Sequence, residues 1–227
     1  KNVYLRILPP DGQVTVSVPT YVTTTELSNF LLSKLPDIYL RQERMRSQPR
    51  QTERTYVSGE AHYLWGKPYR LQVVYEGTRA AVVKRASKLV MTVPDGYTLE
   101  QRERVMTEWY RAELRRVLKS ATKRCEQVTG IEADNFRIKN MKTRWGTCNI
   151  PQRRIWLNLQ LVKKPPECLD YVITHELVHL VEANHTHRFH ELVEQYCPAW
   201  READKALKEM PLDHISGGEM PIAERNA

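Results

Sequence analysis

The sequence predicts an α+β fold, in which a mainly β N-terminal region precedes a domain of mixed helices and strands. Short segments of alternating apolar and polar residues fill much of residues 1–93. One long helical pattern then covers residues 98–129. A small antiparallel sheet and an apolar helix that carries His-Glu-x-x-His come after it. We therefore divide the chain into a basic, mainly β region at 1–93, a mixed domain at 94–210 and a flexible tail at 211–227.

The composition is typical of a soluble globular protein. Of the 227 residues, 41% are hydrophobic and 27% are charged, which are ordinary fractions for a domain with its own core. No run reaches the roughly 18 apolar residues of a transmembrane helix, so we expect no membrane contact. The cysteines stand far apart without a C-x-x-C pair, which excludes a disulfide framework and a zinc finger and favours reduced thiols in a cytoplasmic protein. They are Cys125, Cys148, Cys168 and Cys197.

The net charge of +8 is concentrated in the N-terminal part of the chain. Residues 1–90 hold 14 Lys and Arg against 7 Asp and Glu, a balance of +7, whereas residues 91–227 hold 21 against 20, a balance of +1. An arginine-rich run at 41–54 contributes much of this excess. Such a region is typical of contact with nucleic acid or another polyanion, and also of a well-solvated surface. We keep nucleic acid as an alternative partner of this region.

The first predicted elements are a hairpin and a helix. Residues 2–8 and 13–18 alternate and flank Pro-Pro-Asp-Gly, which predicts a β-hairpin. Residues 24–35 place apolar side chains at helical spacing, which predicts a short capped helix. Further strands are predicted at 61–75, with a turn at 66–68, and at 80–84 and 88–93.

The long helix at 98–129 has one apolar face, with charges of both signs on its other faces. Gly130 supplies its end, because glycine readily takes the left-handed conformation that terminates helices. We interpret this helix as the scaffold of the second domain. Its apolar stripe consists of Leu114, Val117, Leu118, Ala121, Cys125 and Val128.

Strand patterns return after the long helix. Residues 136–142 alternate, and a turn is predicted at 149–153. Residues 155–161 then alternate again, which predicts a half-buried strand that completes a hairpin. Its inward positions are Ile155, Leu157, Leu159 and Leu161.

A helix with two histidines follows. Pro165 and Pro166 predict its start, because proline fits the first turn of a helix. On this helix, His175 and His179 lie four positions apart, so both imidazoles project from one face and can hold one metal ion. Glu176 lies about 100° further round, where its carboxylate can reach a metal-bound water without being a ligand. A surface helix that carries these residues by chance is the plainer interpretation, but the apolar flanks disfavour it.

A catalytic zinc site takes three protein ligands, and His185 is the third ligand that the spacing favours. Asn184 before it tolerates a left-handed conformation, which would end the helix and turn the chain back. Thr186 then caps a helix to about residue 196, and a last helix runs from 198 to about 210. Other side chains that compete for the third position are His187, His190, Glu191 and Glu194.

In two motifs the chain resembles the YgjP-like metallopeptidases, which are relatives of the SprT-like zinc proteases. The motifs are Thr143-Arg144-Trp145-Gly146-Thr147-Cys148-Asn149 and, after it, His175-Glu176-Leu177-Val178-His179-Leu180 with Asn184-His185-Thr186. The family has serine at the positions of Thr147 and Thr186. The resemblance covers about residues 60–210 and implies a zincin-like catalytic domain. It also implies one zinc ion, held by His175, His179 and His185, with Glu176 as the catalytic acid and base.

The implied function is hydrolysis of peptide bonds in a protein or peptide substrate by a zinc metallopeptidase. Two alternatives stay open. One is a metal-dependent hydrolase of nucleoside triphosphates, although the chain has no Gly-rich phosphate loop. The other is a SprT-like protease that the basic N-terminal region recruits to nucleic acid. Metzincins share the histidine spacing, but they need glycine where this chain has Glu182, and Met210 is a poor match for their methionine turn.

The segment from Arg144 to Cys148 has no ligand spacing of its own. One interpretation is a strand that lines the site, where Gly146 lets the backbone come close and Arg144 orients a carboxylate or polarises the substrate. Another is a packing corner in which Trp145 and Cys148 have structural roles. A Cys148 thiolate as a metal ligand in a resting state is a third interpretation.

Overall fold

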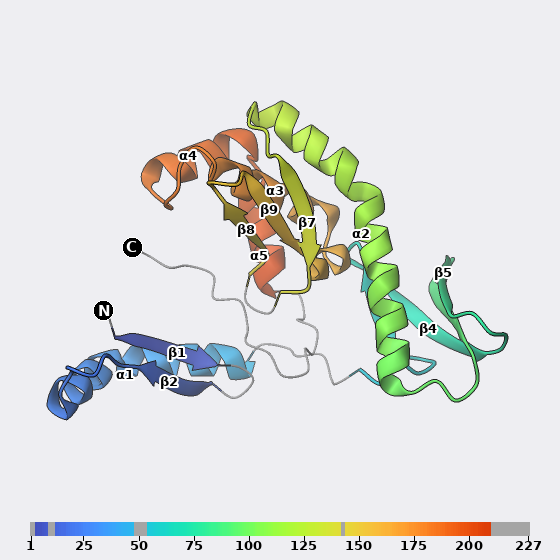
Figure 1. The fold of residues 1–227 in the computed structure, drawn as a ribbon, viewed down its shortest axis with the longest axis horizontal. Helices are drawn as coiled ribbons and strands as arrows, with labels where there is room; N and C mark the ends of the chain where they lie inside the picture. Colours follow the sequence, from blue (N-terminus) through green and yellow to red (C-terminus); the bar gives the residue numbers. More distant parts are fainter. Residues whose placement is uncertain (1–2, 9–11, 48–53, 142–143, 210–227) are drawn as a thin grey trace. The chain divides into compact units, whose positions relative to one another are not determined.

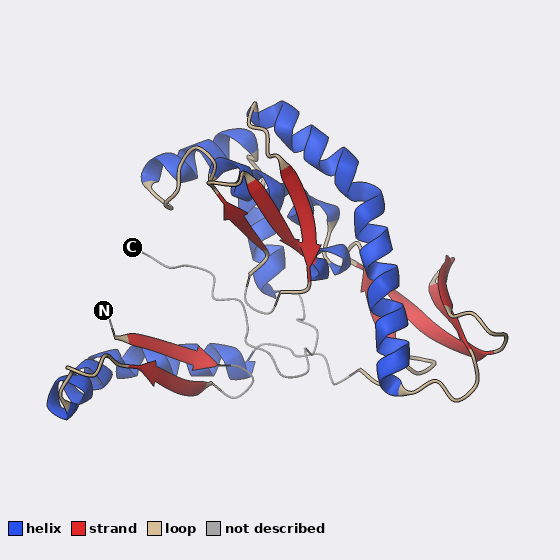
Figure 2. Ribbon diagram, in the orientation of Figure 1, coloured by secondary structure: helices blue, strands red, loops and turns tan. Residues whose placement is uncertain are grey.

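The computed structural model describes residues 3–8, 12–47, 54–141 and 144–209, which form two compact units (Figures 1 and 2). The described residues contain five α-helices and three small sheets, in agreement with the predicted mixture of helices and strands. The first unit precedes residue 54, and the second begins there. The predicted domain boundary after residue 93 stays a prediction. The predicted flexible tail at 211–227 lies outside the described residues.

The first unit consists of the predicted hairpin and one helix. Strands β1 (Tyr4–Leu8) and β2 (Gln13–Ser17) pair antiparallel, and helix α1 (Thr24–Ser47) follows them. The helix runs beyond the predicted end at residue 35 and passes through Pro36. A proline inside a helix frees the carbonyl four residues earlier, here that of Leu32. Because Leu32 and Pro36 are both exposed, water can satisfy this carbonyl and the helix continues.

The second unit opens with a four-stranded sheet. Its strands are β3 (Ala61–Leu64), β4 (Lys67–Tyr75), β5 (Ala81–Arg85) and β6 (Lys88–Val93), in the order β3-β4-β6-β5. Both outer pairs are antiparallel, and β4 and β6 run parallel in the centre. Leu71 of β4 and Leu89 and Met91 of β6 are buried in the hydrophobic core of this unit.

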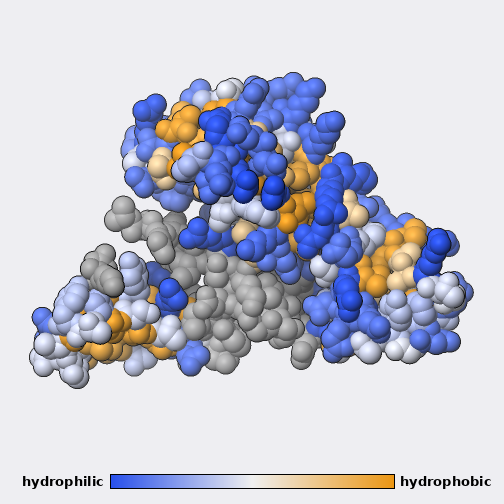
Figure 3. All heavy atoms as spheres, in the orientation of Figure 1, coloured by the Kyte–Doolittle hydropathy of each residue, from blue (hydrophilic) through white to orange (hydrophobic). Residues whose placement is uncertain are grey.

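Helix α2 (Leu99–Thr129) confirms the predicted scaffold helix and its two ends. Thr98 forms a capping box with Gln101, and Gly130 ends the helix at a φ of 67°, in the left-handed region. A cap of this kind contributes about 1 kcal/mol. Leu114, Ala121 and Cys125 of the predicted stripe are buried. Hydrophilic residues cover most of the side of α2 that is seen in Figure 3, as the predicted charged faces require.

The second sheet is mixed, so the prediction of an antiparallel sheet is wrong. It contains β7 (Asn135–Lys139), β8 (Gly146–Asn149) and β9 (Arg154–Asn158), in the order β7-β9-β8. The predicted hairpin of β8 and β9 is antiparallel, but β9 pairs on its other edge with β7, and that pair is parallel. Alternation in a sequence shows which residues point inward but not which strand lies alongside. The parallel pairing of β7 with β9 therefore could not be predicted from the alternating pattern.

The predicted strand at 155–161 ends three residues early. A 3-10 helix, η1 (Leu159–Lys163), replaces its last part. Asn158 starts this turn, because its Oδ1 accepts a hydrogen bond of 3.1 Å from the Gln160 N–H. Leu159 and Leu161 remain buried as predicted, but from a helical turn. Three helices complete the unit: α3 (Pro166–Val178), α4 (His187–Tyr196) and α5 (Trp200–Glu209).

The core of the second unit lies between α2, α3 and the two sheets. Ile155 and Leu157 of β9 and Ile173 and Leu177 of α3 are fully buried. Burial of each such side chain contributes about 1.5–3 kcal/mol. This core fixes α3 against β8 and β9, and that contact positions the site. Of the helices in the described residues, none has the length and apolar character needed to cross a membrane.

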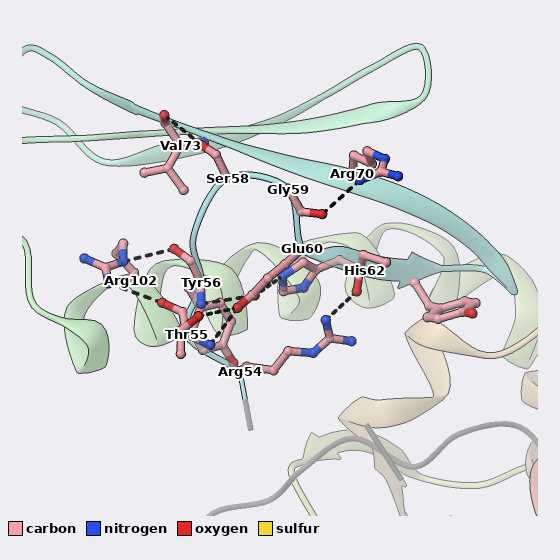
Figure 4. A network of polar contacts seen from close by, with 12 residues as sticks. Arg54, Thr55, Tyr56, Ser58, Gly59, Glu60, His62, Arg70, Val73 and Arg102 are labelled. Atoms are coloured by element: carbon pink, nitrogen blue, oxygen red, sulfur yellow. Dashed lines mark hydrogen bonds and ion pairs between the residues drawn. The ribbon is translucent and has the colours of Figure 1, made fainter. Parts of the chain in front are cut away.

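Glu60, just before β3, is the centre of a polar network (Figure 4). Its carboxylate accepts hydrogen bonds from the backbone and hydroxyl of Thr55, at 2.8 and 2.6 Å, and from the Tyr56 N–H, at 3.1 Å. His62 Nε2 lies 3.2 Å from the same carboxylate. Arg102 of α2 donates to the carbonyls of Thr55 and Tyr56. The network therefore ties the segment before β3 to the first turns of α2.

This network is expected to make stability depend on pH. Burial is the main reason that the pKa of His62 falls from 6.5 to about 4. Between these two values the unfolded chain binds more protons than the folded protein, so the free energy of unfolding falls as the pH is lowered from 6.5 towards 4. We expect a loss on the order of 1–3 kcal/mol, since one pKa unit corresponds to about 1.4 kcal/mol.

Urea denaturation of the wild-type protein and His62→Gln at pH 7 and pH 5 measures this loss. The variant should lose less stability between the two pH values, because its amide does not titrate. Other buried histidines contribute equally to both proteins, so the difference isolates His62. Equal losses of stability in the two proteins would show that His62 does not cause the pH dependence.

Candidate functional site

Helix α3 is the most deeply buried helix of the second unit, and the first two predicted ligands lie in its last turn and at its C-cap. Leu169, Ile173 and Leu177 form its inner stripe, each at most 2% exposed. Pro165 stands at its N-cap, as predicted. The helix ends at Val178, with His179 as its C-cap residue.

The predicted way in which this helix ends is wrong. The sequence interpretation carried the helix on to a left-handed Asn184, but Asn184 is not among the described non-glycine residues with positive φ. The chain instead leaves the helix through tight bonds, from the N–H of Leu180 to the Leu177 carbonyl and from that of Val181 to the Val178 carbonyl. Such three-residue bonds commonly close the last turn of a helix. The reversal towards residue 185 therefore begins earlier than predicted.

Three histidines nevertheless converge. One ligand atom from each of His175, His179 and His185 lies within 4.8 Å of the other two. The Nε2 atoms of His175 and His185 are 3.1 Å apart. Two imidazole nitrogens approach this closely when one carries a proton for the other, or when both face a shared cation. His175 and His179 are half-buried, whereas His185 is exposed and comes from the segment between α3 and α4.

The electrostatics of the cluster favour neutral imidazoles. Burial, and then the neighbouring histidines, lower the pKa of His175 to about 3, and burial is also the main cause that lowers the pKa of His179. His179 Nδ1 lies 3.3 Å from the Glu182 carbonyl, to which it can donate, and this leaves Nε2 as the free ligand atom. A neutral imidazole offers a lone pair to a divalent ion, and three imidazoles meet here. The residues present therefore fit a metal.

Phe189, in the first turn of α4, supports the cluster from one side. Its ring centroid lies 4.8, 4.7 and 4.6 Å from those of His175, His179 and His185, and the residue is 1% exposed. Thr186 caps α4 as predicted and accepts a hydrogen bond from the Phe189 N–H at 3.3 Å. The sequence assigned Phe189 no role in the site, although the Thr186 cap placed it in the first helical turn.

Replacement of Phe189 by alanine is expected to loosen all three histidines. The cavity should cost about 3–5 kcal/mol of stability, which is usual for a buried phenylalanine. Divalent-ion affinity should fall by about 10–100-fold, as for other residues that orient metal ligands. Thermal denaturation and titration with a chromophoric chelator measure the two effects. Phe189→Leu is the control and should retain most of the affinity, and equal affinities of all three proteins would contradict the supporting role.

Glu176 is buried against β8. The residue is 6% exposed, and burial raises the pKa of its carboxyl group to about 8, while the charge of Arg144 opposes the rise. Gly146 of β8 lies next to this side chain, because a Cβ built on Gly146 would come 2.5 Å from Glu176 Oε1. Glu176 therefore occupies a desolvated place between α3 and the sheet.

The four competing ligands point to other partners or lie apart from the cluster. His187 pairs with Glu191 at 3.3 Å, and both side chains are exposed. Glu194 accepts hydrogen bonds from Trp200 and Arg201. The ring of His190 is exposed and lies 6.3 Å from those of both His185 and Trp200. Among the described residues, none of these four belongs to the group whose ligand atoms converge.

The predicted supporting residues stand at the β8 edge of the site. Arg144 is exposed, and its charge acts on Glu176. Trp145 is half-buried, and Lys164 Nζ lies 5.5 Å from its ring centroid. Cys148 is half-buried, and burial followed by the charge of Glu176 raises the pKa of its thiol to about 11, which keeps the thiol protonated. Its Sγ is not among the converging ligand atoms.

The family model of the YgjP-like metallopeptidase domain matches residues 1–210, so the match also includes the N-terminal region. Among solved structures, the chain is similar to the crystal structure of the metallopeptidase zymogen of Pyrococcus abyssi abylysin. The sequence identity is 20%, the TM-score is 0.37, and the match covers 39% of this chain and 90% of that chain. No curated protein matches the sequence. Because the family model covers nearly the whole sequence, the chain belongs to the YgjP-like metallopeptidase family of metal-dependent hydrolases.

Proposed function

We propose that the protein is a zinc-dependent metallopeptidase whose zincin-like second unit holds one zinc ion between His175, His179 and His185. The observation that carries the proposal is the convergence of three imidazoles, whose ligand atoms lie within 4.8 Å of one another. Three histidine nitrogens match the donor set of catalytic zinc sites. When bound, zinc would supply a Lewis acid that polarises a carbonyl group and lowers the pKa of a water molecule to about 7.

Glu176 is the residue that moves protons in this proposal. Because burial raises its pKa to about 8, its carboxylate is a stronger base than a carboxylate in water. The carboxylate takes a proton from the attacking water and then gives it to the nitrogen of the leaving amine. The charge of Arg144 favours the ionised form of Glu176, so the same group can accept and release the proton near neutral pH.

A protein or peptide is the substrate that the family membership supports. Hydrolysis of nucleoside triphosphates has less support, because the sequence holds no Gly-rich phosphate loop. Recruitment to nucleic acid rests only on the excess of 14 basic over 7 acidic residues at positions 1–90. The four free cysteines support a cytoplasmic location.

Hydrolysis assays with two substrate classes test the proposal. The metal-free protein, prepared with a chelator, is supplied with zinc and offered unfolded casein or a nucleoside triphosphate. We expect zinc-dependent cleavage of casein and its loss on renewed chelation. Cleavage of the nucleotide without cleavage of casein would reject the peptidase assignment and leave a metal-dependent hydrolase. Salt-dependent retention on DNA is measured in parallel, because phosphate contacts weaken steeply with salt.

A further inference from the structure

Gly146 begins strand β8 on the side of the sheet that faces α3. It pairs with Leu157 of β9, and Cys148 pairs with Ile155. Paired residues point to the same face of a sheet, and both β9 partners are fully buried. Thr147 and its partner Trp156 point to the opposite face. The Cα of Gly146 is therefore turned towards the Glu176 side of α3.

A side chain at this position would have to displace the side chain of Glu176. A Cβ built on Gly146 would come 2.5 Å from Glu176 Oε1, 2.7 Å from Cγ and 2.9 Å from Cδ. All three nearest atoms belong to the Glu176 side chain, and separations this short are essentially absent from folded proteins. Glu176 is 6% exposed, so its carboxylate has little open space into which it could move aside.

The backbone itself does not require glycine here. Gly146 is not among the glycines with positive φ, and it lies in a regular strand pair. An L-residue could adopt this conformation, in contrast to Gly130 with its φ of 67°. The close approach to Glu176 is therefore the constraint that the structure places on this position.

Asn158, at the end of β9, holds the backbone that leads into Gly146. Its Nδ2 donates to the carbonyls of Met141, at 2.8 Å, and Arg144, at 2.7 Å, and its backbone N–H donates to the Trp145 carbonyl at 2.8 Å. Asn158 is 2% exposed, so these bonds are shielded from water and rigid. The backbone just before Gly146 is thus fixed to β9.

We propose that Gly146 is a positioning residue that sets the place of the Glu176 carboxylate. The bare Cα of Gly146, held by Asn158 and β9, forms the surface against which this carboxylate rests. In this role Gly146 acts through Glu176, whose side chain supplies the three atoms nearest to it. The inference rests on the proposed function, because Glu176 moves the proton there. A carboxylate displaced by about 1 Å lowers turnover by on the order of 100-fold.

A steric double-mutant cycle tests the contact without any activity assay. In the metal-free protein, Gly146→Ala should lower the midpoint of thermal denaturation by about 2–12 °C, because overpacking costs about 1–3 kcal/mol and each kcal/mol shifts a chain of this size by about 2–4 °C. In a Glu176→Ala background the same substitution should have little effect, because all three crowded atoms are gone. Equal shifts in both backgrounds would overturn the proposal.

Folding and kinetics complete the test. If Gly146→Ala does not fold, recovery of folded protein in the double variant supports the contact, and failure to recover overturns it. If it folds, kcat on casein should fall by about 10–100-fold, with KM and bound zinc unchanged. Thr147→Val, which alters the opposite face of the same strand, is the matched control and should change neither kcat nor the midpoint.

The two proposals fail in different ways. Full activity of Glu176→Gln would reject the proposed function, whereas the thermal cycle would still decide whether Gly146 places the Glu176 side chain. An inactive Glu176→Gln together with wild-type kcat in Gly146→Ala would leave the function standing and reject the positioning role.

Discussion

Replacement of Glu176 by glutamine is expected to lower kcat for peptide hydrolysis by about 10²–10⁴-fold, which is the usual contribution of a general acid and base. Glutamine has the same shape as glutamate, so it should fit the space beside Gly146, but its amide cannot accept the proton of the attacking water. Because Glu176 is not among the converging ligand atoms, the variant should keep one zinc ion per chain. Steady-state kinetics and elemental analysis of the same preparation measure both quantities.

The thermal stability of the Glu176→Gln variant, measured together with its activity, distinguishes a proton carrier from a structural residue. Glu176 is buried, and a neutral side chain there removes the need to bury a charge. The glutamine variant should therefore be at least as stable as the wild-type protein at pH 8 and above. An inactive variant that also unfolds at a much lower temperature would point to a structural role, and a fully active variant would remove Glu176 from the mechanism.

Replacement of His185 by alanine is expected to have the largest effect on metal binding. His185 is the proposed ligand from the segment between α3 and α4, and its Nε2 lies 3.1 Å from that of His175. Without it, two imidazoles remain, which is one fewer than a catalytic zinc site uses. Zinc affinity should fall by more than the roughly 10–100-fold that is typical for outer-shell residues, and casein hydrolysis should fall with it.

The matched control for this variant is His190→Ala. His190 is an exposed histidine of α4, and its ring lies 6.3 Å from that of His185. It was a competing candidate for the third ligand, but it lies outside the converging group. We expect zinc affinity within about threefold of the wild-type value, a change that corresponds to less than 1 kcal/mol. A larger loss of zinc affinity in His190→Ala than in His185→Ala would show that the wrong histidine was assigned to the site.

Local signals predicted the parts of this fold that depend on local chemistry. Gly130 ended α2 because glycine tolerates a positive φ, and Thr186 capped α4 because its hydroxyl accepts a backbone N–H. The i and i+4 spacing of His175 and His179 follows directly from helix geometry. The structure brings these two residues together with His185, although the chain reaches His185 by a different route from the predicted one.

The parts that could not be predicted depend on contacts between distant segments. The parallel pairing of β7 with β9 leaves no mark on the alternation of either strand. The change from strand to 3-10 helix at Asn158 could not be predicted from the sequence. Buried apolar residues lie on both sides of Asn158, and a run of apolar residues fits either structure. The contact of Gly146 with Glu176 joins residues 30 positions apart. The sequence suggested that the backbone at Gly146 makes a close approach, but it did not identify Glu176 as the neighbour.

Anomalous diffraction from crystals of the zinc-loaded protein would locate the ion that the three imidazoles are proposed to bind. We expect one zinc peak per chain, ligated by nitrogen atoms of His175, His179 and His185. A peak ligated by His190 or Glu194, or a protein that retains no zinc when it is loaded at stoichiometric concentration, would contradict this expectation.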